Sequence, residues 1–133
     1  MGIYKFNASG EVSIFRLTTH KKELIETRSN SILPLMKDVV ARLLGNFAIG
    51  RVDTVKVYRA TLLLASVPIV EYIHPELNKA QYNVVFDEGS FNGSFDELGL
   101  FSSNMGQVSK LSGLTGSKLS TEKLLITWTI SIL

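Results

Sequence analysis

Two histidines and no cysteine limit the metal and nucleophilic chemistry of this sequence. His20 and His74 are far apart in the chain, so they do not form the i, i+4 pair of a zinc-binding helix, and no thiolate can complete a ligand set. His74 precedes Pro75, and a residue before proline is held in extended conformations, so we interpret His74 as shaping a loop. A hydrolase that joins either histidine to a carboxylate in space stays open. The sequence itself predicts no catalytic residue, metal ligand or cofactor.

Two pairs of carboxylates flank a predicted turn at 89–93. Asp87-Glu88 and Asp96-Glu97 could face each other across a hairpin as the acid and base of a glycosidase, or could bind calcium. Neighbouring residues of a strand point to opposite faces, however, so each pair places one carboxylate outward, and the DxDxDG pattern of calcium loops is absent. We interpret these residues as solubilising charges at strand ends.

The stretch Gly113 to Lys118, which reads GLTGSK, has some features of a phosphate-binding loop. Its first glycine is misplaced for the GxxxxGK[ST] pattern, and no helical periodicity follows it. We therefore predict a glycine-rich connection between strands.

Aromatic side chains could provide stacking platforms for sugars or single-stranded nucleic acid. Tyr72 and Phe91 have the sequence contexts that favour exposure, since Phe91 lies in a polar turn and Tyr72 follows Glu71. They are the two predicted contact residues. We expect the others to be core residues: Tyr58, Tyr82, Phe95 and Phe101.

The composition indicates one folded domain spanning 1–133. The chain has 133 residues, of which 45% are hydrophobic, with 14 basic and 12 acidic side chains. A net charge of +2 gives little reason to expect a nucleic-acid partner. The longest uncharged stretch, Leu98 to Ser109, is polar in part and shorter than the roughly 20 apolar residues of a membrane span. The mild apolar excess is typical of surface buried between subunits.

One amphipathic helix is predicted at about 32–44. Its apolar residues recur at spacings of three and four, with charged residues on the opposite face. Ser29 to Ser31 could cap its start, and Gly45-Asn46 could end it. We interpret this helix as covering a sheet.

The remaining elements are predicted to be β-strands. Residues 1–17 are expected to form a hairpin, with strands Ile3–Phe6 and Val12–Leu17 around a turn at 7–10, and Thr18 to Asn30 a surface connection. Residues 52–133 are expected to form an antiparallel β-sandwich with strands at 52–58, 61–70, 81–87, 95–101, 107–111 and 123–133. The fold class predicted is therefore mainly β, with one helix.

The last of these strands alternates strictly between apolar and polar residues. Trp128 lies on its apolar side and is predicted to face the core. The strand carries no charge after Lys123, so as an exposed edge it would invite aggregation. We expect it to be central or covered.

The segment from Phe91 to Leu133 contains FNGSFDELGLF, then GQVSKL, then KLSTEKLLITWTISI. It resembles the C-terminal half of small structural tail and tail-fibre-type proteins of tailed double-stranded DNA bacteriophages. In these proteins an Asn-Gly turn leads to a strand ending E-[IL]-G-L-F, and the chain closes on a threonine-alternating strand. Asn92-Gly93, Glu97 to Phe101 and Leu125 to Ile130 match that pattern, whereas Gly50 to Thr54 is only loosely similar and the N-terminal hairpin has no counterpart.

The resemblance implies a virion structural protein and not an enzyme. Such a protein is made in the host cytoplasm and assembles as a homo-oligomer, together with other virion proteins, in a tail, collar, baseplate or fibre attachment. Gly93, Gly99 and Trp128 would then have structural roles. Gly93 would belong to a turn, Gly99 would allow the backbone to approach a neighbour closely, and Trp128 would fill the core. No small-molecule substrate is implied. The alternative is a lectin-like carbohydrate-binding module for host recognition that would use Tyr72, Asp87, Phe91 and Asp96.

Overall fold

The fold is built almost entirely from antiparallel strands. The computed structural model describes residues 8–33, 35–36, 51–73 and 79–132. The described strands form a nine-stranded sheet in the order β4-β3-β8-β9-β2-β1-β11-β6-β5 and a two-stranded sheet of β10 and β7. Their bounds are β1 (Ala8–Thr18), β2 (Lys21–Ile32), β3 (Thr54–Arg59), β4 (Leu62–Pro68), β5 (Glu71–Ile73), β6 (Lys79–Phe86), β7 (Gly93–Phe95), β8 (Glu97–Ser102), β9 (Gly106–Leu111), β10 (Gly116–Lys118) and β11 (Lys123–Ile132).

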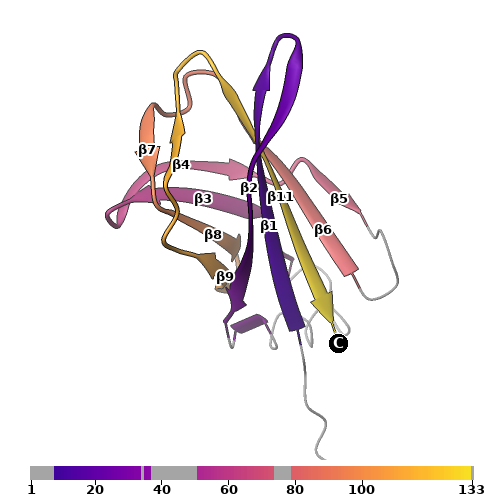
Figure 1. The fold of residues 1–133 in the computed structure, drawn as a ribbon. Coiled ribbons are helices and arrows are strands. Elements are labelled where there is room, and N and C mark those ends of the chain that lie inside the picture. The colour runs from indigo at the N-terminus through magenta and orange to yellow at the C-terminus, as the bar shows by residue number, and fades with distance from the viewer. Residues whose placement is uncertain (1–7, 34, 37–50, 74–78, 133) are drawn as a thin grey trace, which may run out of the picture.

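The large sheet folds into two layers whose strands cross (Figure 1). One layer holds β3, β4, β8 and β9, and the other holds β1, β11, β6, β5 and most of β2. Strand β2 links the layers, because only its end, Ser31 and Ile32, pairs with β9. Strands that pass from one layer to the other form the corners of crossed β packings. The mainly β prediction is confirmed, and the arrangement is consistent with a β-sandwich.

The core fills the space between the layers, and β11 lies at its centre. Leu124, Ile126, Trp128 and Ile130 are buried at alternate positions of β11, which pairs with β1 on one side and β6 on the other. The predicted inward orientation of Trp128 and the central position of its strand are both confirmed. Buried side chains from both layers meet these residues: Val12, Ile14, Val55, Val57, Val84, Phe86, Leu98, Leu100 and Val108.

A second corner joins the layers at Pro68 to Val70. The Ile69 N–H donates to the Asp53 carbonyl oxygen at 2.8 Å, and the Val70 N–H donates to the Asn83 carbonyl oxygen at 3.0 Å. Before this corner the chain pairs with β3 as β4, and after it the chain pairs with β6 as β5. These strands are the two ends of the sheet order, so one segment supplies both edges.

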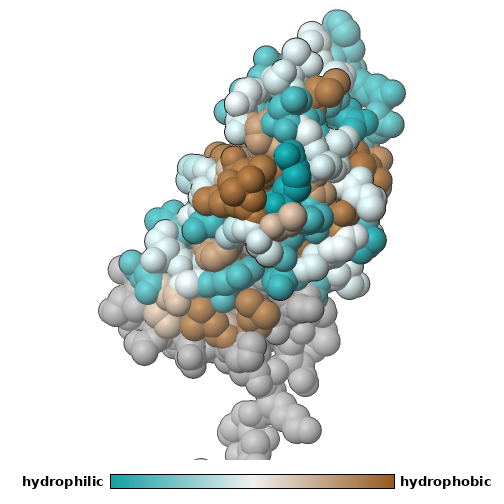
Figure 2. Space-filling model, turned by 90° about the vertical axis from the view of Figure 1, so that its left-hand side faces the viewer, coloured by the Kyte–Doolittle hydropathy of each residue, from teal (hydrophilic) through white to brown (hydrophobic). Residues whose placement is uncertain are grey.

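Strand β4 is an exposed edge with an apolar surface. No charged residue occurs from Thr61 to Val70, and the Leu62 and Leu63 side chains are 64% and 47% exposed. Figure 2 views the side of the molecule on which the β3–β4 turn lies, and it shows apolar side chains gathered in the middle of that face. Edge strands usually carry charges that discourage pairing with another chain.

The predicted N-terminal hairpin is wrong in its turn and its partner. Strand β1 begins at Ala8, where a turn was expected, and it pairs with β2, which occupies the predicted surface connection. Nearly every described side chain of β2 is exposed because the β1–β2 ribbon extends beyond the core (Figure 1). Without a buried face, β2 has no apolar alternation to reveal it. The expected strand Ile3–Phe6 lies outside the described residues.

The predicted helix at 32–44 is not seen as a whole, because only Leu35 and Met36 have helical backbone in the described part of that range. Ile32 pairs with Ser109 as the last residue of β2, so a helix does not begin there. The Met36 N–H donates to the Leu33 carbonyl oxygen at 2.9 Å, which forms a single turn, and 37–44 lies outside the described residues. The proposed capping residues are therefore held in a strand, Ser29 and Asn30 by pairing with β1 and Ser31 by pairing with β9.

The turn between β3 and β4 is strained. Ala60 and Thr61 have φ values of 47° and 69°, and in the described part of the chain they alone among non-glycine residues have positive φ. Two-residue hairpins with both angles positive strongly prefer Asn-Gly, and a β-branched residue is disfavoured there. The Asp96 carboxylate holds this conformation by accepting the Ala60 N–H at 2.9 Å.

Replacing the strained pair should stabilise the fold. Because left-handed geometry costs a non-glycine residue roughly 1–2 kcal/mol, Ala60→Asn with Thr61→Gly should raise the free energy of unfolding by about 1 kcal/mol. Urea denaturation measures this change. Thr19→Asn with His20→Gly is the matched control, because the β1–β2 turn has no positive φ, and it should give no gain. Equal effects of the two variants would contradict the account.

Candidate functional site

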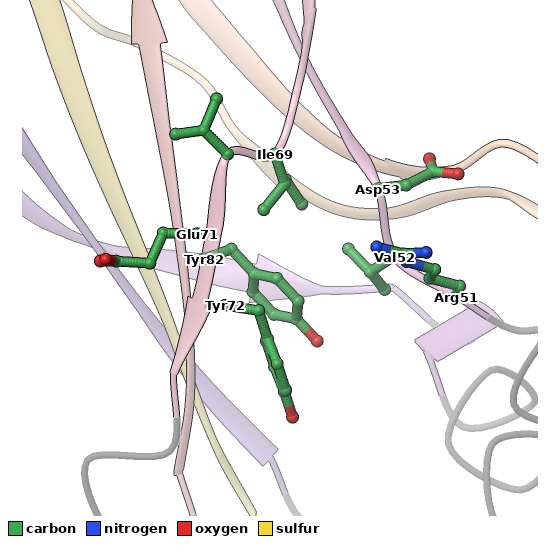
Figure 3. Close-up of a pocket in the computed structure, with 8 residues that line it drawn as sticks. Arg51, Val52, Asp53, Ile69, Glu71, Tyr72 and Tyr82 are labelled. Atoms are coloured by element: carbon green, nitrogen blue, oxygen red, sulfur yellow. The ribbon is translucent and has the colours of Figure 1, made fainter.

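A pocket of about 170 Å³ opens beside the second corner, and we name it the corner pocket (Figure 3). The start of β3, the corner itself, β5 and β6 all contribute to it. The residues that line it are Arg51, Val52, Asp53, Ile69, Val70, Glu71, Tyr72 and Tyr82. It therefore combines apolar walls, two tyrosine rings and three charged side chains, those of Arg51, Asp53 and Glu71.

Two tyrosines form one wall of the corner pocket. Tyr72 of β5 lies directly opposite Tyr82 of β6, with ring centroids 5.1 Å apart and ring planes tilted by 37°. Tyr82 is buried, whereas Tyr72 is 46% exposed. Burial raises the pKa of both phenols, and for Tyr82 the neighbouring Tyr72 adds to the effect. Both hydroxyls are therefore neutral at neutral pH and able to donate and accept hydrogen bonds.

The carboxylates at the corner pocket already have hydrogen-bond donors. Glu71 accepts the Asn83 side-chain amide at 2.7 Å, and its side chain points away from the tyrosines (Figure 3). Asp53 accepts the Thr54 hydroxyl at 2.9 Å and, from Ser103, the N–H at 3.1 Å and the hydroxyl at 2.7 Å.

The exposed Arg51 lies across the pocket from the tyrosines (Figure 3). Among the described residues, no carboxylate forms an ion pair with it. The pocket thus presents one cation whose donors are available to a ligand.

The two predicted contact residues have different positions. Tyr72 is exposed, as expected, and lines the corner pocket; its role in contacts stays a prediction. The expected exposure of Phe91 is wrong, because it is 8% exposed. Its ring packs edge-on against Phe86 at 5.7 Å and Phe95 at 5.8 Å. The turn folds over the end of the core, so the polar neighbours of Phe91 stay outside while its ring enters.

The predicted structural glycines lie at crowded positions. Gly93 has a φ of 111°, and a Cβ there would lie 2.5 Å from an Arg59 guanidinium nitrogen. At Gly99 a Cβ would lie 2.5 Å from the Phe101 ring and 2.8 Å from the Gln107 amide. The close approach expected at Gly99 is thus made by side chains instead of backbone.

Lys118 is a buried lysine that the sequence did not indicate. Its side chain is fully buried, and Nζ donates to the carbonyl oxygens of Phe91 at 3.2 Å and Leu119 at 3.0 Å. Nζ also lies 5.4 Å from the Phe91 ring centroid. Burial lowers the pKa of Lys118, against the opposing effect of nearby carboxylates. Because the Lys118 amine donates to backbone carbonyl oxygens inside the fold, it is not positioned to bind a phosphate at the GLTGSK stretch.

The carboxylate pairs serve separate contacts and do not converge. Asp87 lies 3.8 Å from the Lys123 amine, Asp96 caps the β3–β4 turn, and Glu97 lies 3.6 Å from the Lys110 amine. The described residues contain no group of three or more His, Asp or Glu that could hold a metal ion. His74 lies outside the described residues.

The lectin-like set does not form one site either. Phe91 is buried, Asp96 holds a turn, and Asp87 lies five residues beyond Tyr82 along the chain, about 17 Å for an extended strand. Only Tyr72 of that set lines the corner pocket. Arg51 and Tyr82 were not singled out as contact residues because they are distant from Tyr72 in the sequence. Within the described part of the chain, no helix is long and apolar enough to span a membrane.

The buried phenol of Tyr82 should make the fold sensitive to alkali. In the unfolded chain Tyr82 ionises near its ordinary pKa of 10.0, whereas burial keeps it protonated in the fold. Above pH 10 the unfolded state therefore binds fewer protons, and the free energy of unfolding falls by up to about 1.4 kcal/mol per pH unit from this group. Urea denaturation between pH 9 and about 11 measures the slope.

Tyr82→Phe should reduce this alkaline slope, and Tyr58→Phe should reduce it less, because burial raises the pKa of the partly buried Tyr58 by a smaller amount. The lowered pKa of Lys118 acts in the opposite direction, since the unfolded state binds more protons between that pKa and 10.5. Both tyrosine variants retain Lys118, so the difference between their alkaline slopes is free of the contribution from this lysine. A slope unchanged by Tyr82→Phe would contradict the burial of this phenol.

The Lys118 side chain should be required for stability. Lys118→Ala removes a buried stem and a donor to two carbonyls, so it should cost about 3 kcal/mol. Lys118→Met keeps most of the stem and should cost about half as much. Lys110→Ala, which removes a partly exposed ion pair, should cost less than about 1 kcal/mol. Thermal and urea unfolding measure the loss in free energy of unfolding for the three variants. Equal losses for Lys118→Ala and Lys110→Ala would disprove the stabilising role of Lys118.

Comparison with known proteins leaves the chain without an assigned relative. No family model matches it, and neither the curated proteins nor the solved structures include a significant match. The function proposed below therefore depends on the geometry of the chain and on the resemblance of residues 91–133.

Proposed function

We propose that this chain is a structural subunit of the virion of a tailed bacteriophage and that copies assemble through the edge of β4. The observation that carries the proposal is the uncharged, apolar surface of an edge strand. In the described part of the chain β4 pairs with β3 alone, so one row of its backbone N–H and C=O groups remains available to a partner strand.

The side chains of β4 support association. Leu62 and Leu63 are consecutive exposed leucines, and neighbouring exposed apolar side chains occur at sites of protein association. They follow the strained Ala60-Thr61 turn, and strain of this kind is commonly retained where a segment has a function beyond folding. The irregularity near Leu64 and the proline at position 68 interrupt the edge, but the part next to the turn has no charge to prevent pairing.

A second copy of the chain is the partner that the edge best fits. Two β4 strands can pair antiparallel about a two-fold axis, which joins two sheets and brings the same leucines together from both subunits. Such an interface is closed by symmetry, so it yields a defined oligomer instead of an open fibre. Other virion proteins would then contact the surfaces that remain exposed.

The resemblance of residues 91–133 to tail and tail-fibre-type proteins supports the virion setting. That segment supplies β8, β9 and the central β11, which are elements of the core. The motifs that carry the resemblance thus belong to the scaffold, while the proposed contact surface comes from β4. A protein whose work is mechanical needs both a stable scaffold and a subunit contact.

Light scattering on a sizing column tests the proposal. Over a tenfold range of concentration the chain should form a dimer, with twice the 14.7 kDa subunit mass, because the two-fold β4 contact closes at two copies. Leu62→Lys with Leu63→Lys should shift this species toward monomer by placing like charges at the interface. Leu119→Lys is a matched control, because Leu119 is 61% exposed but lies outside β4, and it should leave the mass unchanged.

Two results would contradict the proposal. A strict monomer over the whole concentration range would remove self-assembly. An oligomer that is unaffected by the β4 variant but disrupted by Leu119→Lys would move the contact to another surface.

A further inference from the structure

The corner pocket has the properties of a ligand site that assembly through β4 does not require. It joins an available cation to two neutral phenols and an apolar wall, all held by elements that the second corner connects. Leu62 and Leu63 do not line it. Ligand binding in the corner pocket can therefore be tested independently of the oligomeric state.

The size of the pocket favours a single ring. Its volume is about 170 Å³, and an engineered cavity of about 150 Å³ accommodates benzene. The half-exposed Tyr72 ring provides a flat surface at the mouth, while Val52 and Ile69 provide apolar contacts inside. One six-membered ring therefore matches this volume and can pack against the exposed part of the Tyr72 ring.

The charge of the pocket favours a carboxylate. The two acidic residues in the wall are satisfied by Asn83, Thr54 and Ser103, whereas Arg51 pairs with no carboxylate among the described residues. A guanidinium presents parallel N–H donors that match the two oxygens of a carboxylate. An anionic ligand thus gains a charge-assisted contact that a neutral ligand lacks.

The phenols distinguish between the two kinds of ring that could carry this carboxylate. The hydroxyls of Tyr72 and Tyr82 lie at the same end of the tyrosine pair (Figure 3), and both are neutral and can donate or accept hydrogen bonds. An aromatic acid has no ring hydroxyl with which to form a hydrogen bond to either phenol. A sugar ring presents hydroxyls to them and an apolar C–H face to Tyr72.

We propose that the corner pocket binds an acidic sugar, a pyranose ring bearing a carboxylate. The carboxylate contacts Arg51, the ring packs on Tyr72, and the ring hydroxyls contact the two phenols. Tyr72 was predicted as a contact residue of a carbohydrate-binding module, but the partners that the fold gives it are Arg51 and Tyr82 instead of Asp87, Phe91 and Asp96.

Titration by NMR with defined probes tests the proposal on the full chain. Glucuronate should shift backbone resonances around the corner pocket saturably, and glucose, which lacks the carboxylate, should bind about tenfold more weakly or not at all. Benzoate, an aromatic acid, should also bind more weakly than glucuronate. Failure of glucuronate to saturate the shifts would overturn the site, and preference for benzoate would overturn the sugar assignment.

Variants separate the contributions of the residues. Arg51→Gln should weaken glucuronate binding about tenfold and remove the preference over glucose, while Tyr72→Ala should weaken both sugars. Arg28→Gln is the matched control, because Arg28 is a partly exposed arginine of β2 paired with Glu26, and it should bind glucuronate as the parent chain does. Equal affinity of the Arg51 and Arg28 variants would overturn the carboxylate contact.

The Leu62→Lys, Leu63→Lys variant should keep its affinity for glucuronate, because neither leucine lines the corner pocket. Unchanged binding in a monomer would show that the site does not need assembly. Loss of binding in this variant would contradict a site contained within one subunit.

Discussion

Two backbone hydrogen bonds at the second corner determine the position of both proposed surfaces. The amides of Ile69 and Val70 donate to opposite layers, one to the start of β3 and the other to β6. They turn one uncharged segment from the edge of the first layer to the edge of the second. Without this crossing, β4 would have no fixed relation to β6, and Tyr72 would not lie opposite Tyr82.

The crossing also separates the two proposed roles. Leu62 and Leu63 lie at the beginning of β4, and Ile69 lies just beyond its end, so an extended strand places them about 20 Å apart. Assembly through the beginning of β4 therefore leaves the corner pocket available. A subunit of this design could join its neighbours and present a ligand site on the same particle.

The sequence could predict the strands that bury one face, and it failed where a strand buries none. Alternation revealed β11, whose Trp128 enters the core, but β2 is exposed at nearly all of its described side chains and carries no such signal. Phe91 and Lys118 were missed for a related reason. Their buried state depends on a turn that folds over the core and on carbonyls supplied by Phe91 and Leu119, contacts that local residue patterns do not encode.

Amide hydrogen exchange at low and high protein concentration tests most directly whether the segment from Thr61 to Ile73 combines a fixed corner with an open edge. The amides of Ile69 and Val70 should be protected at both concentrations, because their hydrogen-bond partners lie within one subunit. Between Leu62 and Val67, the amides that do not pair with β3 should gain protection at high concentration, because they form hydrogen bonds in the interface. Rapid exchange at Ile69 and Val70 would contradict a fixed corner. Unchanged protection of β4 in a sample whose molecular mass increases with concentration would contradict an open edge that pairs on assembly.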